Sequence, residues 1–188
     1  MIEIVPYNPD WPVEFTKIAT NVRAALGPLV LRIDHIGSTS VPNLPAKDII
    51  DVQITVAVLD NTVVAAMNSI GYTLAEGNWS DHCPPGAPTA DAEWEKYFFR
   101  PPPGHRRTNT HMRTPGRANQ RYPLLFRDYL RLHPATAAAY AELKRRLAEF
   151  LRNTDDYPYV KDPAVDLIYL AAEEWATVTG WQMRPSDT

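Results

Sequence analysis

Cysteine is nearly absent from this chain of 188 residues, because Cys83 is its one thiol. A single cysteine excludes an internal disulfide framework and a cysteine-rich zinc site, and the five histidines lack the spacing of metal ligands. No apolar run approaches the roughly 18 residues of a membrane span, and the first residues lack the basic segment and apolar stretch of a secretory signal. We therefore expect a soluble, cytoplasmic protein without a membrane partner.

A large excess of charge of one sign is also missing. The formal net charge is −3 and the isoelectric point is near 5.9, so the overall charge gives no reason to expect a nucleic-acid partner. With 45% hydrophobic residues, the chain is able to bury a substantial core. No repeat or low-complexity linker divides it, and we expect a single domain over residues 1–188.

Acidic residues are absent between Tyr97 and Arg127, although this stretch contains seven arginines. The planar guanidinium group suits phosphate and carboxylate ligands. Arg100 and Arg113 lie within expected strands and are therefore the preferred candidates for binding an anion. The alternative is that these arginines pair with acids elsewhere or are solvated at the surface.

Apolar periodicity predicts a mixed sheet flanked by helices. Strands are expected over 2–5, 29–36, 49–57, 72–74, 95–100 and 108–114, the last two as a hairpin. Helices are expected over 10–26, 60–70, 122–132 and 134–151 and from Asp162 onward, with a frayed tail from Gln182. The predicted fold class is α/β (α+β), with a sheet core over 1–118 and a C-terminal helical part over 119–181.

Gly37 and Ser38 form a turn at the end of an expected strand. Because glycine lacks a Cβ and the serine hydroxyl donates a hydrogen bond, such a turn lets the backbone approach a phosphate. Asp51 lies in the next strand among Ile and Val residues, where a carboxylate needs a partner or a metal ion. Together they predict that Asp51 holds Mg²⁺ against a phosphate. The alternatives are an ordinary turn at Gly37 and an ion pair between Asp51 and an arginine.

Two further candidates follow from strand alternation. Gln53 lies on the same strand face as Asp51, so we expect both side chains to line an accessible cleft. His111 and Arg113 likewise share one face of the strand over 108–114. A strand histidine is commonly a hydrogen-bonding residue, but a position beside Arg113 and an anion site also makes His111 a candidate catalyst.

These motifs together resemble the GrpB family, which also occurs as the C-terminal extension of some bacterial dephospho-CoA kinases. The resemblance rests on the segments 7–12, 35–42, 45–51, 98–100, 110–113, 124–131 and 141–144, and it covers nearly the whole chain. It implies a nucleotidyltransferase-like fold and membership of a superfamily that transfers a nucleoside monophosphate from a triphosphate to an acceptor.

The chain departs from active nucleotidyltransferases, which generally carry two acids on the strand after Gly-Ser and a third on a later strand. Here Gln53 replaces the second acid, and His111 occupies the centre of the later strand.

Two hypotheses remain open. The first is a Mg²⁺-dependent nucleotidyltransferase with a nucleoside triphosphate and a small-molecule acceptor as substrates. Its site residues would be Gly37, Ser38, Thr39 and Lys47 for the triphosphate, Asp51 and Gln53 for the metal, and Arg100, His111 and Arg113 for the acceptor or leaving group. The second is a noncatalytic nucleotide- or anion-binding module, or a folding helper for another protein.

Overall fold

The computed structural model describes residues 2–188 as a five-stranded mixed sheet covered by helices. The strands are β1 (Val30–Ile36), β2 (Ile50–Val56), β3 (Thr73–Leu74), β4 (Tyr97–Arg100) and β5 (Thr108–Arg113), in the spatial order β1-β2-β5-β4-β3. β2 and β5 run parallel, and the other neighbours run antiparallel. The predicted α+β class and the hairpin of β4 and β5 are confirmed. The strand expected over 2–5 is reduced to an isolated bridge between Val5 and Ala46.

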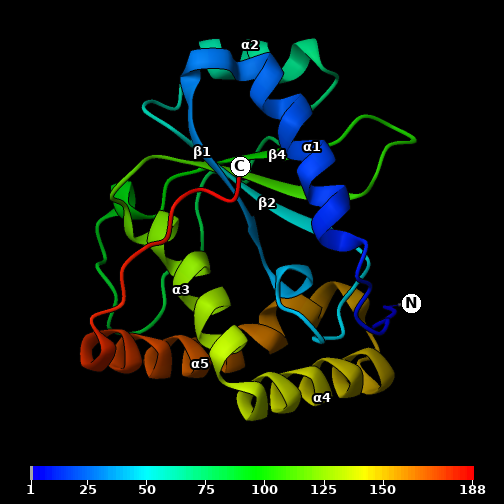
Figure 1. Cartoon of the computed structure of the whole chain (residues 1–188). Coiled ribbons are helices and arrows are strands. Elements are labelled where there is room, and N and C mark those ends of the chain that lie inside the picture. Colours follow the sequence, from blue (N-terminus) through cyan, green and yellow to red (C-terminus); the bar gives the residue numbers. More distant parts are fainter. Residues whose placement is uncertain (1) are drawn as a thin grey trace.

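Helices cover both faces of the sheet (Figure 1). The helices α1 (Trp11–Leu26) and α2 (Asn61–Ser69) lie on one face, and α3 (Ala118–Leu132), α4 (Pro134–Phe150) and α5 (Tyr157–Thr179) lie on the other. Because side chains alternate along β2, Ile50, Val52 and Ile54 are fully buried in the core shared with α1 and α2. Asp51 and Gln53 consequently face the three C-terminal helices.

The first two helices follow their sequence signals closely. α1 carries a proline in its first turn and ends at Gly27, whose positive φ of 53° an L side chain rarely adopts. Asp60 caps α2, because its side chain accepts hydrogen bonds from the backbone N–H groups of Thr62 and Val63. Each of these helices buries one apolar stripe against the sheet, on the face that carries Ile50, Val52 and Ile54.

The last helix begins earlier than predicted. Asp162 and Pro163 together are typical of a helix start, but α5 begins at Tyr157 and contains Pro163 within it. Pro158 occupies the first turn instead, where its missing N–H costs nothing. The extra turns place Lys161 on the helix surface that faces the sheet, with consequences for the site described below.

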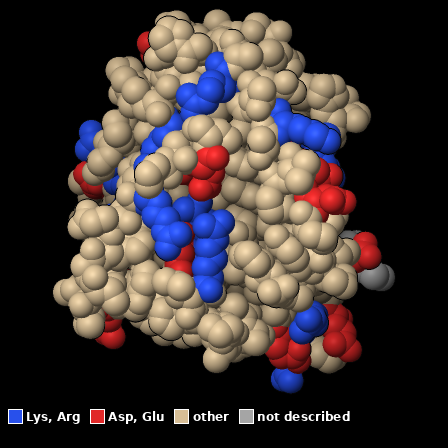
Figure 2. All heavy atoms as spheres, viewed as in Figure 1, with Lys and Arg blue, Asp and Glu red and all other residues tan. Residues whose placement is uncertain are grey.

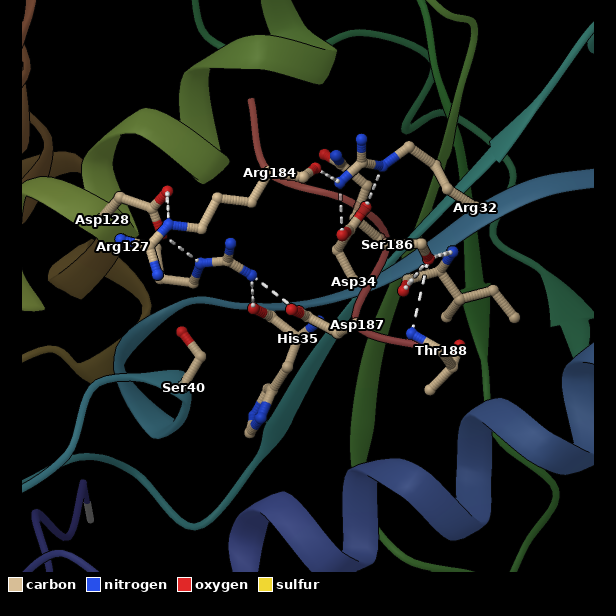
Figure 3. Close-up of polar contacts among 12 residues, drawn as sticks. Arg32, Asp34, His35, Ser40, Arg127, Asp128, Arg184, Ser186, Asp187 and Thr188 are labelled. Carbon is tan, nitrogen blue, oxygen red and sulfur yellow. Dashed lines mark hydrogen bonds and ion pairs between the residues drawn. The ribbon is translucent and has the colours of Figure 1, made fainter. Parts of the chain in front are cut away.

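The C-terminal tail is ordered against the edge strand β1, so the prediction that it frays from Gln182 is wrong (Figure 3). The Ser186 hydroxyl accepts from the N–H of Ile33 at 2.9 Å and donates to the Ile33 carbonyl at 2.8 Å. The Asp187 carboxylate accepts from the N–H of His35 at 2.9 Å and from Arg127 at 2.7 Å. Side chains of the tail therefore satisfy backbone groups that an edge strand leaves unpaired.

Several basic side chains lie beside this tail. Lys and Arg side chains gather on the face of the molecule that the tail and α3 cross (Figure 2). Arg32 donates to Asp34 through two nitrogens, while Arg127, which is 1% exposed, donates to Asp128 and to the His35 carbonyl. Arg32 and Arg127 thus pair with carboxylates of the same chain, and their charges need no external ligand.

A second apolar cluster joins α3, α4 and α5 to the loop after β1. Val41 and Leu44 of that loop pack among Leu125, Leu130 and Tyr140. The C-terminal helices are thereby held against the loop that carries the Gly37-Ser38 turn. Among the described residues, no helix is both long enough and apolar enough to cross a membrane.

Candidate anion-binding site

A pocket of about 230 Å³ opens at the end of the sheet where β1 stops and β2 and β5 start. Its walls come from three parts of the chain: the turn and loop between β1 and β2, the first residues of β2 and β5, and the inner surfaces of α4 and α5. The polar lining residues are Ser38, Thr39, Lys47, Asp51, Asn109, Tyr140, Lys144, Tyr157 and Lys161. The predicted residues Ser38, Thr39, Lys47 and Asp51 are therefore brought together.

Gly37 is required by the close approach of the turn to Asp51. Its φ is +68°, which disfavours any residue with a Cβ, and a Cβ built there would overlap the Asp51 carboxylate. Antiparallel pairing of β1 with β2 sets Ile36 opposite Asp51 and so delivers the turn to this position. Local sequence and strand register thus combine to put the Gly-Ser turn beside the carboxylate.

The Asp51 carboxylate is held from the neighbouring strand. Parallel pairing places Asn109 opposite Asp51, and the Asn109 amide donates to Asp51 Oδ1 at 2.8 Å. Burial raises the pKa of the Asp51 carboxyl group, while this hydrogen bond and the charges of Lys161 and Lys144 act in the opposite direction. The alternative of an ion pair between Asp51 and an arginine is not seen: within residues 2–188 the side chain accepts its hydrogen bond from Asn109 and takes part in no salt bridge.

Lys144 of α4 contacts the Gly-Ser turn directly. Its ammonium group donates to Ser38 Oγ at 2.9 Å and to the Pro45 carbonyl at 2.5 Å. The residue is 3% exposed, and burial together with the charge of Lys161 lowers the pKa of its ammonium group to about 7. Burial and a second cation in the same pocket thus both act against the charged form of Lys144.

Lys47 and Lys161 complete the cationic side of the pocket. Lys47 Nζ lies 3.6 Å from the centre of the Tyr157 ring, a cation–π contact, and burial and the charges of Lys161 and Arg107 lower the pKa of its ammonium group. Burial also acts against the charge of Lys161, but Tyr140 and Asp51 outweigh it and raise the pKa. Three ammonium groups therefore share the pocket with one carboxylate.

Gln53 does not lie in an accessible cleft, contrary to the expectation from strand alternation. It is fully buried, its amide Nε2 donates to the Gln120 carbonyl at 3.0 Å, and its Oε1 accepts from Arg113 at 2.7 Å. Both polar atoms of its amide are consequently engaged by protein groups. The cause is α3, which covers the part of this sheet face beyond Asp51.

Arg113 belongs to a buried polar network rather than to the pocket lining. Its guanidinium group makes a forked ion pair with Asp81, at 2.8 Å from Nε and 3.0 Å from Nη2. Asp81 also accepts from Lys96 at 2.8 Å, and the charge of Arg113 holds the pKa of Asp81 far below its usual range despite burial. The network fastens the long loop before β4 to the sheet.

His111 and Arg100 are also outside the pocket lining. His111 lies two residues further along β5 than Asn109 and opposite Phe98, with the centres of the two rings 5.1 Å apart in an edge-on arrangement. Burial and the neighbouring charge of Arg113 lower the pKa of His111 well below its usual value. Arg100 is exposed at the end of β4, opposite Thr73.

Sequence reasoning missed the lysines and tyrosines that α4 and α5 contribute. One signal was available: Lys144 lies one turn after Tyr140 on the helix stripe that also contains Ala141, and all three are buried. A lysine in such a stripe needs a partner or a ligand.

The fold and the pocket define an α+β protein with a cationic site built around one carboxylate at the end of a mixed sheet. Residues 1–170 match the family model described as GrpB protein. The chain therefore belongs to the GrpB family, in agreement with the resemblance of its motifs.

Relatives of known sequence and structure support this assignment. The chain is 35% identical to a dephospho-CoA kinase of Mycolicibacterium paratuberculosis, over 96% of its own length and 48% of that protein. It is 36% identical to a UPF0157 protein of Pseudomonas aeruginosa, over 87% of this chain and 64% of that one. A crystal structure of the conserved protein GrpB from Enterococcus faecalis matches with a TM-score of 0.74 and 30% identity, covering 92% of this chain and 99% of that chain. The chain spans about half the length of the kinase relative.

Proposed function

We propose that this protein binds a nucleoside triphosphate in the pocket around Asp51 and acts as a Mg²⁺-dependent nucleotidyltransferase on a small-molecule acceptor. The observation that carries the proposal is the approach of the Gly37 turn to the Asp51 carboxylate. A turn whose backbone comes this close to a carboxylate suits a phosphate that contacts the turn and shares a metal ion with that carboxylate. In this proposal Ser38, Thr39 and Lys47 contact the triphosphate.

The donor set fits one Mg²⁺ held mainly by the substrate. Among the described residues, no group of three or more His, Cys, Asp or Glu side chains gathers as a metal cage. Mg²⁺ is commonly bound through one or two carboxylates, with substrate phosphates and water completing the shell. Asp51 would supply that carboxylate, and the ion would neutralise phosphate charge. Gln53 joins this set only if its amide oxygen leaves Arg113.

A second candidate function is a noncatalytic nucleotide- or anion-binding module. It is favoured by the single carboxylate of the pocket and by the engagement of both Gln53 amide atoms. Such a module would need the lysines but neither Mg²⁺ nor the charge of Asp51. The two functions therefore predict opposite responses when that charge is removed.

Nucleotide affinity of Asp51→Asn, measured at fixed ionic strength with Mg²⁺ and with EDTA, separates them. The transferase proposal expects Mg²⁺ to tighten binding to the wild-type protein and the substitution to abolish this effect, because an amide brings no charge to the ion. A pyrophosphate-release assay with nucleoside triphosphates and candidate acceptors should lose its signal in the same variant. Tighter metal-free binding by Asp51→Asn, without turnover by the wild-type protein, would instead establish the binding module.

A further inference from the structure

The pocket lining holds more cationic than anionic side chains, three lysines against the one carboxylate of Asp51. Three ammonium groups line it, and the burial of Lys144 and its nearness to Lys161 make its charged form unfavourable. Ionisable groups with strongly shifted pKa values are concentrated at functional sites, and a bound anion would compensate these charges. Within the described residues, the carboxylate in this lining is Asp51 alone.

The pocket is also small. Its volume of about 230 Å³ lies below the 300–1,000 Å³ that is usual for sites enclosing a drug-sized ligand. It is thus suited to a chain of phosphates and too small to enclose a whole nucleotide. The nucleoside would extend out of the pocket mouth.

Resting on the proposed function, we propose that Lys144 and Lys161 bind the terminal phosphates of the nucleotide and select a polyphosphate end over a single phosphate. Lys144 reaches the same Ser38 hydroxyl that the Gly-Ser turn offers to the ligand, so a phosphate at Ser38 also meets the α4 ammonium group. Lys161 enters the pocket from α5. The C-terminal helices are in this view one wall of the nucleotide site.

Selectivity follows from the number of cations. A single phosphate carries roughly two negative charges at neutral pH, which is too few to neutralise Lys47, Lys144 and Lys161 together, whereas a chain of two or three phosphates carries more. Each charge-assisted contact also removes part of the repulsion between the lysines. Affinity should therefore rise steeply from orthophosphate to pyrophosphate to tripolyphosphate.

Calorimetric titration with these three inorganic ions in EDTA tests the proposal, because no nucleoside or metal ion contributes. Tripolyphosphate should bind the wild-type protein at least tenfold more tightly than orthophosphate. Lys144→Met and Lys161→Met should each weaken tripolyphosphate binding at least tenfold, whereas Lys17→Met, on the exposed surface of α1, should leave it unchanged. Equal affinities for the three ions, or unchanged affinity in both pocket variants, would overturn the proposal.

Two controls keep the outcomes distinct. Circular dichroism checks folding, and if Lys144→Met does not fold, Lys161→Met and Lys144→Gln decide the question. Asp51-dependent Mg²⁺–nucleotide binding that survives both lysine substitutions would refute this inference and leave the proposed function standing. Lysine-dependent tripolyphosphate binding without any Asp51-dependent Mg²⁺ effect would refute the transferase and leave this inference standing.

Discussion

Removing the Lys144 charge should make the protein more stable while it impairs the site. Lys144 is 3% exposed, and its ammonium group has a pKa of about 7 instead of 10.5. A basic group whose pKa is lower in the folded than in the unfolded state destabilises the fold at every pH at which the unfolded chain is protonated at that group. We therefore expect Lys144→Met, which keeps an apolar stem of similar length, to raise the free energy of unfolding at neutral pH.

The magnitude follows from the two pKa values and the lost contacts. Lowering the pKa from 10.5 to about 7 costs the folded state roughly 4 kcal/mol at pH 7. The substitution also removes the hydrogen bonds to Ser38 and Pro45, worth about 1 kcal/mol each. The expected net stabilisation is about 2 kcal/mol, or about 4–8 °C in melting temperature for a chain of this length.

The pH dependence gives the prediction its sign. The cost of the buried charge is fully present below the folded pKa of about 7 and vanishes as pH rises toward the unfolded pKa of 10.5. Thermal unfolding of Lys144→Met and wild type, measured from pH 6 to pH 9, should show a difference that shrinks with rising pH. A variant that is less stable at pH 6, or a difference that grows with pH, would refute the reasoning.

Three further predictions concern neighbouring parts of the structure. Gly37→Ala should abolish nucleotide binding, measured by calorimetry, because the added Cβ overlaps the Asp51 carboxylate; unchanged affinity would contradict the close packing of the turn. Gln53→Glu should lower the free energy of urea unfolding by about 1–3 kcal/mol, because an acceptor replaces the amide that donates to a backbone carbonyl of α3, and it should add no Mg²⁺-dependent stabilisation. Asp187→Ala should cost about 1–3 kcal/mol in the same assay, since Arg127 loses a charge partner in the interior; a neutral effect would show that the tail adds nothing to the edge strand.

Much of the sheet was predictable because it rests on local signals. The alternation of apolar and polar residues over β2 and the capping residue Asp60 can each be recognised from a few consecutive residues. The structure has the strand and the helix start at these positions. The start of α5 was not predictable in this way. Pro158 and Pro163 are both acceptable in a first turn, and the helix begins at Tyr157, whose burial in the folded chain no local spacing reveals.

The sequence by itself determined the turn and the carboxylate of the site. Gly37, Ser38 and Asp51 belong to adjoining segments, and antiparallel pairing of consecutive strands brings them together. Tertiary structure alone decided their surroundings. Lys144 contacts Ser38 although 106 positions separate them in the chain. Gln53 lies outside the site because its amide is hydrogen-bonded to α3 and to Arg113. Such contacts depend on how helices dock on a sheet, and no local spacing of residues specifies that.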